Sequence, residues 1–278
     1  MSVACTIASI VDKLKLVNGI SALVLGGSRA RGTDNIHSDI DIGIYYDSSL
    51  GLDIAQLRQV AAELDDDHRE DLVTEIGGWG PWINGGGWLK VNQIAVDFIY
   101  RDQHKVSRVM DECVRGEVRM DYQPGHPHGF ANAIYMAEIS LCQVLWDPSD
   151  VIGNMKSRTI PYPRAFLEAI IGKFLWEATF ALDNGYKGIY KNDISFIAGC
   201  CFRSVSCLNQ VLFAKNETYL MNEKGAAAIA DSFQIVPIQY AQRINDAFAL
   251  ITEDPDSLRE AINKLRELVQ ETKNLING

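Results

Sequence analysis

Apolar positions along the first half of the chain follow two periods, one helical and one of two residues. The helical period predicts amphipathic helices, and the period of two predicts strands with one buried face. Short apolar runs between glycines or polar residues predict further buried strands. Helices are expected over 2–18, 52–64, 101–117 and 131–145, and strands over 23–25, 38–46, 71–76 and 91–100. This half therefore predicts an α+β fold, a mixed sheet flanked by helices.

The second half changes character beyond Pro161 and Pro163, where apolar residues recur at helical spacing. A Ser257-to-Glu260 capping-box pattern opens the last predicted helix. The helices are expected over 166–182, 191–214, 226–233, 237–251 and 257–275. The chain should thus hold two domains, a catalytic α+β domain over 1–150 and an all-helical C-terminal bundle over 151–278.

A glycine-serine turn, Gly26-Gly27-Ser28, follows the first predicted strand. Its backbone can approach a ligand closely, and its hydroxyl and N–H groups can hold a phosphate. Downstream, the period of two puts Asp39 and Asp41 on one strand face, with isoleucines on the other. Two carboxylates on one face repel each other. One or two Mg²⁺ ions bridged to substrate phosphates would relieve that repulsion.

Each motif alone is common, since a Gly-Gly-Ser segment is usually only a turn and Asp-x-Asp usually an exposed edge strand. Their combination, eleven positions apart, resembles the signature of the polymerase β-like nucleotidyltransferase superfamily. The Gly-Ser-Arg-Ala-Arg-Gly form at 27–32 is similar to its small bacterial members, such as the aminoglycoside and lincosamide nucleotidyltransferases. The resemblance implies a nucleotidyltransferase that moves a nucleoside monophosphate from an NTP to a hydroxyl and releases pyrophosphate.

Several residues would hold the NTP if the resemblance extends to its site. Arg31 is a candidate for neutralising phosphate charge, and its alternative role is to pair with a carboxylate. Lys224 precedes an alanine-rich predicted helix, as does a triphosphate-binding lysine of aminoglycoside nucleotidyltransferases, although surface lysines are usually only solvated. The expected NTP-binding residues are Gly26, Gly27, Ser28, Arg31, Ser38 and Lys224.

A third carboxylate completes the metal site of that superfamily, and Asp97 is the position here that looks like it. Val96 and Phe98 flank Asp97 on a predicted strand, where an unpaired carboxylate would be costly. Asp97 could also accept the proton of the acceptor hydroxyl. Glu75 is the alternative, either as third carboxylate or as a base or supporting group. The predicted metal ligands are Asp39, Asp41 and Asp97.

Two further segments are candidates for the acceptor pocket. Trp79, Trp82 and Trp88 lie in a glycine-rich stretch, where they either cover the end of the core or stack against a nucleobase or acceptor ring. His126 and His128 lie in a loop rich in proline and glycine. They either fix a rigid turn or act in the acceptor pocket, as acid and base near neutral pH.

Composition narrows the choice of partner. A net charge of −10 argues against a nucleic-acid partner and favours a cationic small molecule, although net charge does not set the field of a cleft. No apolar run suggests a membrane span and no leader is evident, so a cytoplasmic location is expected. The six cysteines lack C-x-x-C spacing, which argues against structural zinc, and most should be small buried hydrophobes.

Three functions remain open at this point. The first is Mg²⁺-dependent transfer to a small-molecule acceptor, an antibiotic being the example that the resemblance suggests. The second is nucleotidylation of a protein or tRNA, against which the acidic composition weighs mildly. The third is a catalytically silent NTP-binding regulatory module, against which the serine and all three carboxylates weigh. A homodimer is compatible with each.

Overall fold

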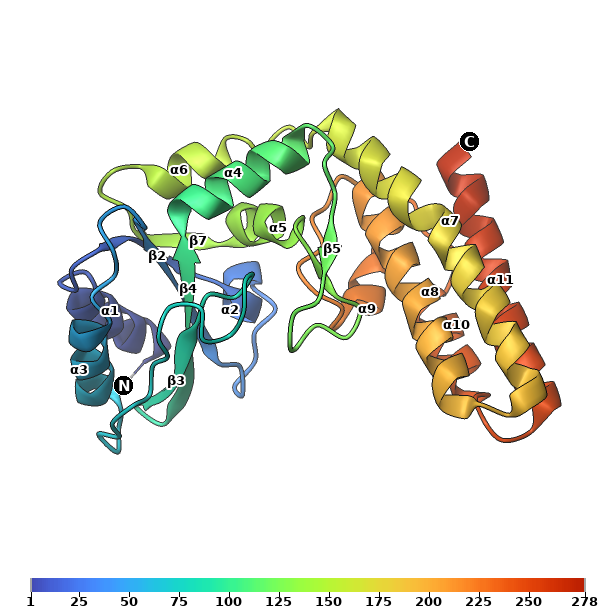
Figure 1. Ribbon diagram of the computed structural model, residues 1–278, viewed down its shortest axis with the longest axis horizontal. Helices are drawn as coiled ribbons and strands as arrows, with labels where there is room; N and C mark the ends of the chain where they lie inside the picture. Colours follow the sequence, from blue (N-terminus) through green and yellow to red (C-terminus); the bar gives the residue numbers. More distant parts are fainter. Residues whose placement is uncertain (1, 278) are drawn as a thin grey trace. The chain divides into compact units, whose positions relative to one another are not determined.

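The computed structural model describes residues 2–277, which form two compact units (Figure 1). The first unit comprises the residues up to 111 together with 122–125 and 135–161. The second comprises 112–121, 126–134 and the residues from 162 onward. The first unit contains a mixed sheet with helices and the second is mostly helical, so the predicted fold class is confirmed.

A five-stranded sheet in the order β3-β4-β2-β1-β7 forms the centre of the first unit. Strands β2 and β4 are parallel, whereas the other neighbours are antiparallel. Helix α3 (Ile54–Leu64) and strand β3 lie between β2 and β4 in the chain and supply the crossover that a parallel pair needs. The strands are β1 (Ile20–Leu25), β2 (Ile40–Tyr46), β3 (Gly86–Val91), β4 (Ile94–Asp102) and β7 (Gln143–Trp146).

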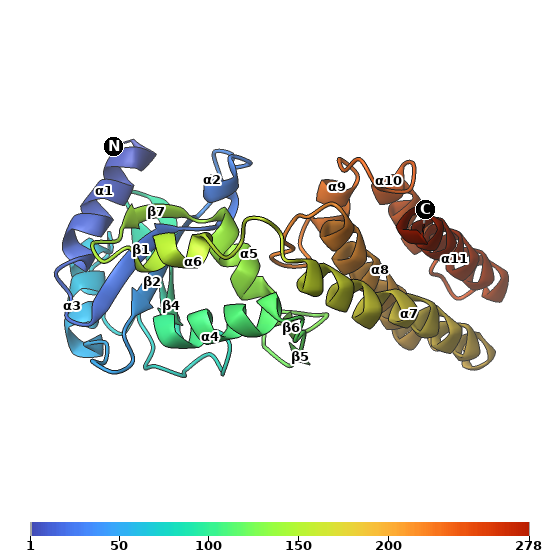
Figure 2. The same ribbon diagram turned by 90° about the horizontal axis from the view of Figure 1, so that it is seen from above.

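One face of this sheet is covered by α1 (Val3–Leu14) and α3 (Ile54–Leu64), which lie side by side in Figures 1 and 2. The isoleucines of β2 point into this core because alternate residues of a strand face the same side. Ile40, Ile42 and Ile44 are all completely buried there. The aspartates between and before them are therefore on the opposite face.

On the opposite face of the sheet, an ion pair lies at the C-terminal end of β4. Arg101 donates to Glu138 of α5 (Ile134–Leu141) through Nε and Nη2, at 2.7 and 2.5 Å. The guanidinium also lies 5.5 Å from the ring centre of Tyr135. Helix α6 (Val151–Lys156) and the part of α4 (Gln103–Val114) up to residue 111 also belong to this unit. On this face Asp41 and Asp97 are only half-buried, whereas Arg101 is buried.

We expect Arg101→Met to destabilise the protein by about 3 kcal/mol, because Glu138 would keep a partly buried charge without its partner. The double variant with Glu138→Leu should recover at least half of that loss, since neither charge is then left alone. Urea-induced unfolding of the full-length variants measures both. Equal stability of the single and double variants would show that the pair is not coupled.

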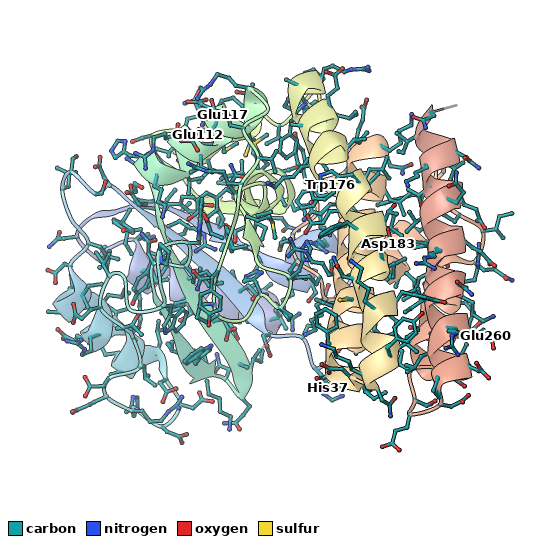
Figure 3. The ribbon with its side chains drawn as sticks, turned by 45° about the vertical axis from the view of Figure 1, so that its right-hand side comes forward. His37, Glu112, Glu117, Trp176, Asp183 and Glu260 are labelled. Carbon is teal, nitrogen blue, oxygen red and sulfur yellow. The ribbon has the colours of Figure 1, made fainter. Side chains whose placement is uncertain are left out.

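The second unit is built on α7 (Arg164–Gly188) and α8 (Ile194–Lys215), joined by the 3₁₀ helix η1 (Ile189–Lys191). Helix α11 (Pro255–Asn277) packs against both, and its Arg266 lies 2.9 Å from Asp183 of α7. Figure 3 labels Asp183 on α7. The remaining elements are β5 (Met120–Asp121), β6 (Phe130–Ala131), α9 (Ala226–Ala230), α10 (Tyr240–Ala249) and α11 (Pro255–Asn277).

Helix α8 is, among the described residues, long and apolar enough to cross a membrane. However, 67% of its apolar window is buried inside the protein, and a core helix passes the same test. Its composition is accounted for by its place in the core of the helical unit. Four of the six cysteines are buried, as expected: Cys113, Cys142, Cys201 and Cys207.

Part of the glycine-rich stretch that carries the three tryptophans forms a strand. Trp88 lies inside β3, which pairs with β4 as a hairpin. Asn92 and Gln93 form the hairpin turn, both with positive φ, which matches the right-handed twist of the strands. The predicted strand over 91–100 is therefore a turn followed by β4.

Three other predictions differ from the structure. Residues 71–76 make only an isolated bridge at Val73, and a positive φ at Asp71 interrupts the extended chain before it. The helix predicted over 131–145 is shorter, because residues 143–146 form β7 and pair with β1. Ser257 is not a cap, since α11 begins two residues earlier and the Asp254 carboxylate accepts from the Ser257 N–H at 3.0 Å.

Candidate active site

Two aspartates and a tryptophan form a row across three neighbouring strands. Asp41 of β2 pairs in register with Asp97 of β4, and Asp97 pairs in register with Trp88 of β3. Residues in register on adjacent strands lie on one face of a sheet, about 5 Å apart. As predicted, Asp41 and Asp97 are thus neighbours, and they lie on the face opposite the buried isoleucines.

The glycine turn closes against this row at the Asp41 end. The Gly26 N–H donates to the Asp41 carbonyl at 2.8 Å. Gly27 has a φ of +62°, and a Cβ at this position would lie only 1.7 Å from Asp41 Oδ2. Two features therefore require glycine at this position: the positive φ, and the Asp41 carboxylate, which leaves no room for a Cβ. Ser28 follows in the short helix α2 (Gly27–Arg31).

Arg29, which the sequence did not single out, fixes the segment that carries Asp39. Its Nε donates to the Asp39 carbonyl at 2.9 Å, and its Nη2 donates to the Ser38 carbonyl. A 3.1 Å ion pair with Asp34 holds the guanidinium in place. The Ser38 hydroxyl accepts from the Asn35 N–H at 2.9 Å, so Ser38 shapes this turn. Arg29 could have been suspected from its place in the Gly-Ser-Arg-Ala-Arg-Gly motif.

Arg31 differs from Arg29 because one of its hydrogen-bond donors is unpaired in the described structure. Within residues 2–277 its Nε is buried and has no hydrogen-bond partner. Burial lowers the pKa of Arg31 from its ordinary value. An anionic phosphate at the turn would satisfy this donor and favour the charged guanidinium.

The electrostatics of the row match a cation site. The pKa of Asp97 is raised to about 6, first by burial and then by the charges of Asp41 and Asp39. Asp39 itself is exposed, just before β2. Across residues 2–277, no three His, Cys, Asp or Glu side chains are gathered closely enough to form a complete metal centre. The mutual repulsion and the hard oxygen donors nevertheless fit a divalent cation such as Mg²⁺.

We expect Asp97→Asn to stabilise the metal-free protein at pH 8 by about 1–2 kcal/mol. Two pKa units correspond to about 2.7 kcal/mol, which solvent screening reduces. The folded-state pKa of Asp97, about 6, lies above its ordinary 3.8, so folding stability falls as pH rises between these values. Urea unfolding without Mg²⁺ should show the gain at pH 8 and little at pH 3.5. An equal effect at both pH values would contradict this.

The structure separates the three candidate tryptophans. Trp88 is 61% exposed and stacks on Trp79, with ring centres 4.5 Å apart. Trp82 is buried, and its ring packs edge-on against Tyr135 with centres 5.6 Å apart. Trp88 thus lies next to Asp97, with Trp79 stacked on it, whereas Trp82 is part of the core.

Glu75 is not brought into the row. Its carboxylate is 2.9 Å from Arg58 of α3, the helix that covers the other face of the sheet. Burial, and after it the charge of Glu75, raises the pKa of Tyr100, whose side chain is in the core on that same face. Asp97 is thus the carboxylate next to Asp41.

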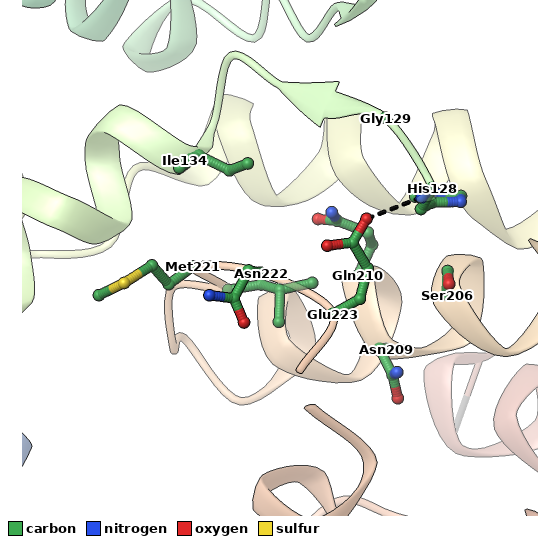
Figure 4. A pocket seen from close by; sticks show the side chains of 10 residues that line it. His128, Gly129, Ile134, Ser206, Asn209, Gln210, Met221, Asn222 and Glu223 are labelled. Atoms are coloured by element: carbon green, nitrogen blue, oxygen red, sulfur yellow. Dashed lines mark hydrogen bonds between the residues drawn. The ribbon is translucent and has the colours of Figure 1, made fainter. Parts of the chain in front are cut away.

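The remaining candidates lie in the second unit. His128 is buried, and in the described part of the chain neither ring nitrogen has a hydrogen-bond partner. Burial and the charge of Arg203 lower its pKa to about 4. Glu223 accepts from the His128 N–H at 2.9 Å, drawn in Figure 4, and lies 3.7 Å from His126 Nδ1. The sequence did not predict this cluster of Glu223 and Arg203.

Lys224 follows this cluster in the chain and is exposed. Gly225, with a φ of +75°, then leads into the short helix α9. The predicted helix entry after Lys224 is confirmed. Its phosphate role stays a prediction.

Comparison with known proteins bears on the same residues. A nucleotidyltransferase-like protein from Exiguobacterium sibiricum has a similar solved structure, with a TM-score of 0.44 and 8% sequence identity over 98% of this chain and 77% of that one. No curated protein matches the chain. Residues 8–76, which include the glycine turn, Asp39 and Asp41, match the family model described as polymerase beta, nucleotidyltransferase. The chain's N-terminal region therefore belongs to the polymerase β-like nucleotidyltransferase superfamily.

Proposed function

We propose that this protein transfers a nucleoside monophosphate from an NTP to a hydroxyl group of a small-molecule acceptor and releases pyrophosphate. One observation carries the proposal: Asp41 and Asp97 lie in register on adjacent strands, and the Gly27 backbone closes against Asp41. A phosphate-binding turn beside paired carboxylates is the arrangement that metal-assisted nucleotidyl transfer needs.

The residues have distinct roles in this proposal. The turn of Gly26, Gly27 and Ser28 holds the terminal phosphates. Arg31 Nε, which has no hydrogen-bond partner among residues 2–277, donates to them. Asp39, Asp41 and Asp97 hold one or two Mg²⁺ ions, which when bound neutralise the charge that develops on the phosphates. Ser38 keeps the Asp39 segment in shape.

Asp97 is the base that accepts the proton of the acceptor hydroxyl. With a pKa of about 6 it is largely ionised at neutral pH, yet more basic than an ordinary aspartate. Its place at the end of the carboxylate pair away from the turn lets it reach a hydroxyl that attacks from that side. Asp97→Asn should therefore remove turnover even where it stabilises the fold.

A small molecule is the acceptor that the charges favour. The net charge of −10 opposes a polyanionic RNA and favours a neutral or cationic compound, of which an aminoglycoside-like antibiotic is an example. Transfer to a protein or tRNA would use the same carboxylates and is the competing outcome of the test.

The test combines each of ATP, GTP, CTP and UTP with Mg²⁺ and a panel of hydroxyl-bearing compounds. Mass spectrometry of the products should find one compound whose mass has increased by a nucleoside monophosphate, together with pyrophosphate. Omission of Mg²⁺ should abolish both products. If polypeptide and RNA are added to the same reactions and only one of them gains the mass of a nucleoside monophosphate, the competing acceptor replaces the small molecule.

A further inference from the structure

We infer that Arg29 is the positioning residue that makes the carboxylate row selective for Mg²⁺ over the larger Ca²⁺. This inference rests on the proposed function and deepens it, because it concerns the metal of the same site. It begins from the segment 32–39, whose residues are exposed apart from the half-buried Ser38. Its one large apolar side chain, Ile36, is 90% exposed. Hydrophobic packing therefore does not hold this segment, which ends at the metal-binding candidate Asp39.

A single guanidinium holds the segment through all three of its nitrogens. Arg29 Nε donates to the Asp39 carbonyl at 2.9 Å, and Nη2 donates to the Ser38 carbonyl. Arg29 Nη1 donates to Asp34 Oδ2 at 3.1 Å. The Arg29 side chain is only 9% exposed, so these bonds are largely shielded from water. Because the donors of a guanidinium are fixed in one plane, they define the positions of all three acceptors.

Hydrogen bonds within the segment make its last turn a single piece. Ser38 Oγ accepts from the Asn35 N–H at 2.9 Å, and the Ser38 N–H donates to the Asn35 carbonyl at 3.0 Å. The Asn35 side chain accepts from the His37 N–H at 2.8 Å. Arg29 belongs to α2, the helix that begins in the glycine turn. It therefore attaches this piece to the element that would hold the phosphates.

The attachment fixes one carboxylate of the row relative to the other two. Asp41 and Asp97 belong to paired strands, so the sheet sets their spacing. Asp39 precedes β2 and is exposed, so its place depends on the turn that Arg29 holds. With Arg29 in place, the main chain at all three carboxylates is fixed before a metal binds.

A site that cannot widen disfavours the larger ion. Mg²⁺ requires near-ideal octahedral geometry with ligands at about 2.0–2.1 Å, whereas Ca²⁺ accepts about six to eight oxygens at about 2.3–2.6 Å in variable geometry. If the Asp39 turn could shift, the carboxylates could spread and give Ca²⁺ longer bonds and further ligands. Arg29 removes this freedom, and we therefore assign it to metal specificity.

The test is Mn²⁺ binding to the full-length protein at pH 7.5, measured by electron paramagnetic resonance, with Mg²⁺ and Ca²⁺ as competitors. All three ions take oxygen ligands. Asp41→Asn serves as the blank, because it removes a ligand of the row and leaves other acidic surface sites unchanged. At the site that the blank lacks, the wild-type protein should bind Mg²⁺ more tightly than Ca²⁺. Arg29→Met should weaken Mg²⁺ binding about tenfold or more, and Ca²⁺ binding less than about threefold.

Two further variants control for the lost charge and for the fold. Arg31→Met removes a cation from the same helix, and Arg31 Nε has no hydrogen-bond partner among residues 2–277. It should leave both metal affinities within about threefold, since only a screened charge is lost. Arg29→Lys keeps the charge but cannot fix several acceptors in one plane, so it should also lose most of the selectivity. It keeps the test decisive if circular dichroism shows that Arg29→Met is unfolded.

The outcomes distinguish this inference from the proposed function. If the row binds Mn²⁺ but the Arg29 variants keep the wild-type ratio of Mg²⁺ to Ca²⁺ affinity, the inference is wrong and the proposed function stands. An equal loss for both ions leaves that ratio unchanged and overturns it in the same way. If the wild-type protein and Asp41→Asn bind Mn²⁺ equally, the row holds no metal, and the proposed function fails together with the inference.

Discussion

Asp41→Asn is expected to lower the rate of NTP-dependent pyrophosphate release by about 10³-fold, while the protein keeps its fold. Asp41 is the one carboxylate that touches both parts of the site, since it is in register with Asp97 and packed against Gly27. Its loss removes charge where the metal and the phosphates would meet. Removal of one such electrostatic group typically costs about 10²–10³ in rate, and a metal ligand is at the upper end.

Steady-state rates at saturating Mg²⁺ and circular dichroism of the same preparation measure activity and fold together. Glu75→Gln supplies the comparison, because Glu75 pairs with Arg58 near the other face of the sheet. We expect it to change the rate by less than about threefold, as surface substitutions usually have small effects. A loss as large as that of Asp41→Asn would move the third carboxylate of the site to Glu75.

Gly27→Ala should remove activity by about 10²-fold or more and destabilise the protein by about 2 kcal/mol. The added Cβ meets Asp41 Oδ2 at 1.7 Å, so the carboxylate or the turn must shift. The φ of +62° adds backbone strain of about 1–2 kcal/mol for a residue with a side chain. A displacement of about 1 Å in a group that positions the phosphates is enough for a loss of this size.

Gly32→Ala separates the two causes. Gly32 also has a positive φ, +70°, but a Cβ there would have no neighbour within 4 Å in the described structure. This variant should lose about 1 kcal/mol of stability through strain alone and retain near-normal turnover. If Gly32→Ala were as inactive as Gly27→Ala, backbone conformation would explain both losses and the contact with Asp41 would not matter.

The local part of the site follows directly from the sequence. The period of two over 38–46 puts Asp39 and Asp41 on the face opposite three isoleucines, and those isoleucines are buried. Gly27 is recognisable because few residues other than glycine adopt its backbone conformation. These features depend only on neighbours in the chain.

The non-local part could not be derived in the same way. Asp97 joins Asp41 through the register of a parallel pair, which the crossover and the β3–β4 hairpin determine. Three tryptophans in one glycine-rich segment look equivalent until the hairpin puts Trp88 on a strand and Trp82 in the core. Arg29 and Arg31 likewise differ only in the partners that the fold provides.

In the proposed reaction, the acceptor hydroxyl attacks the α-phosphorus of an NTP at the row formed by Asp41 and Asp97. Parallel reactions with α-³²P-labelled and γ-³²P-labelled NTP, Mg²⁺ and the acceptor identified by mass spectrometry test it most directly. We predict that the α label moves to the acceptor, that the γ label appears only in pyrophosphate, and that Asp41→Asn abolishes both. Transfer of the γ label to the acceptor, or its release as free phosphate, would contradict the account.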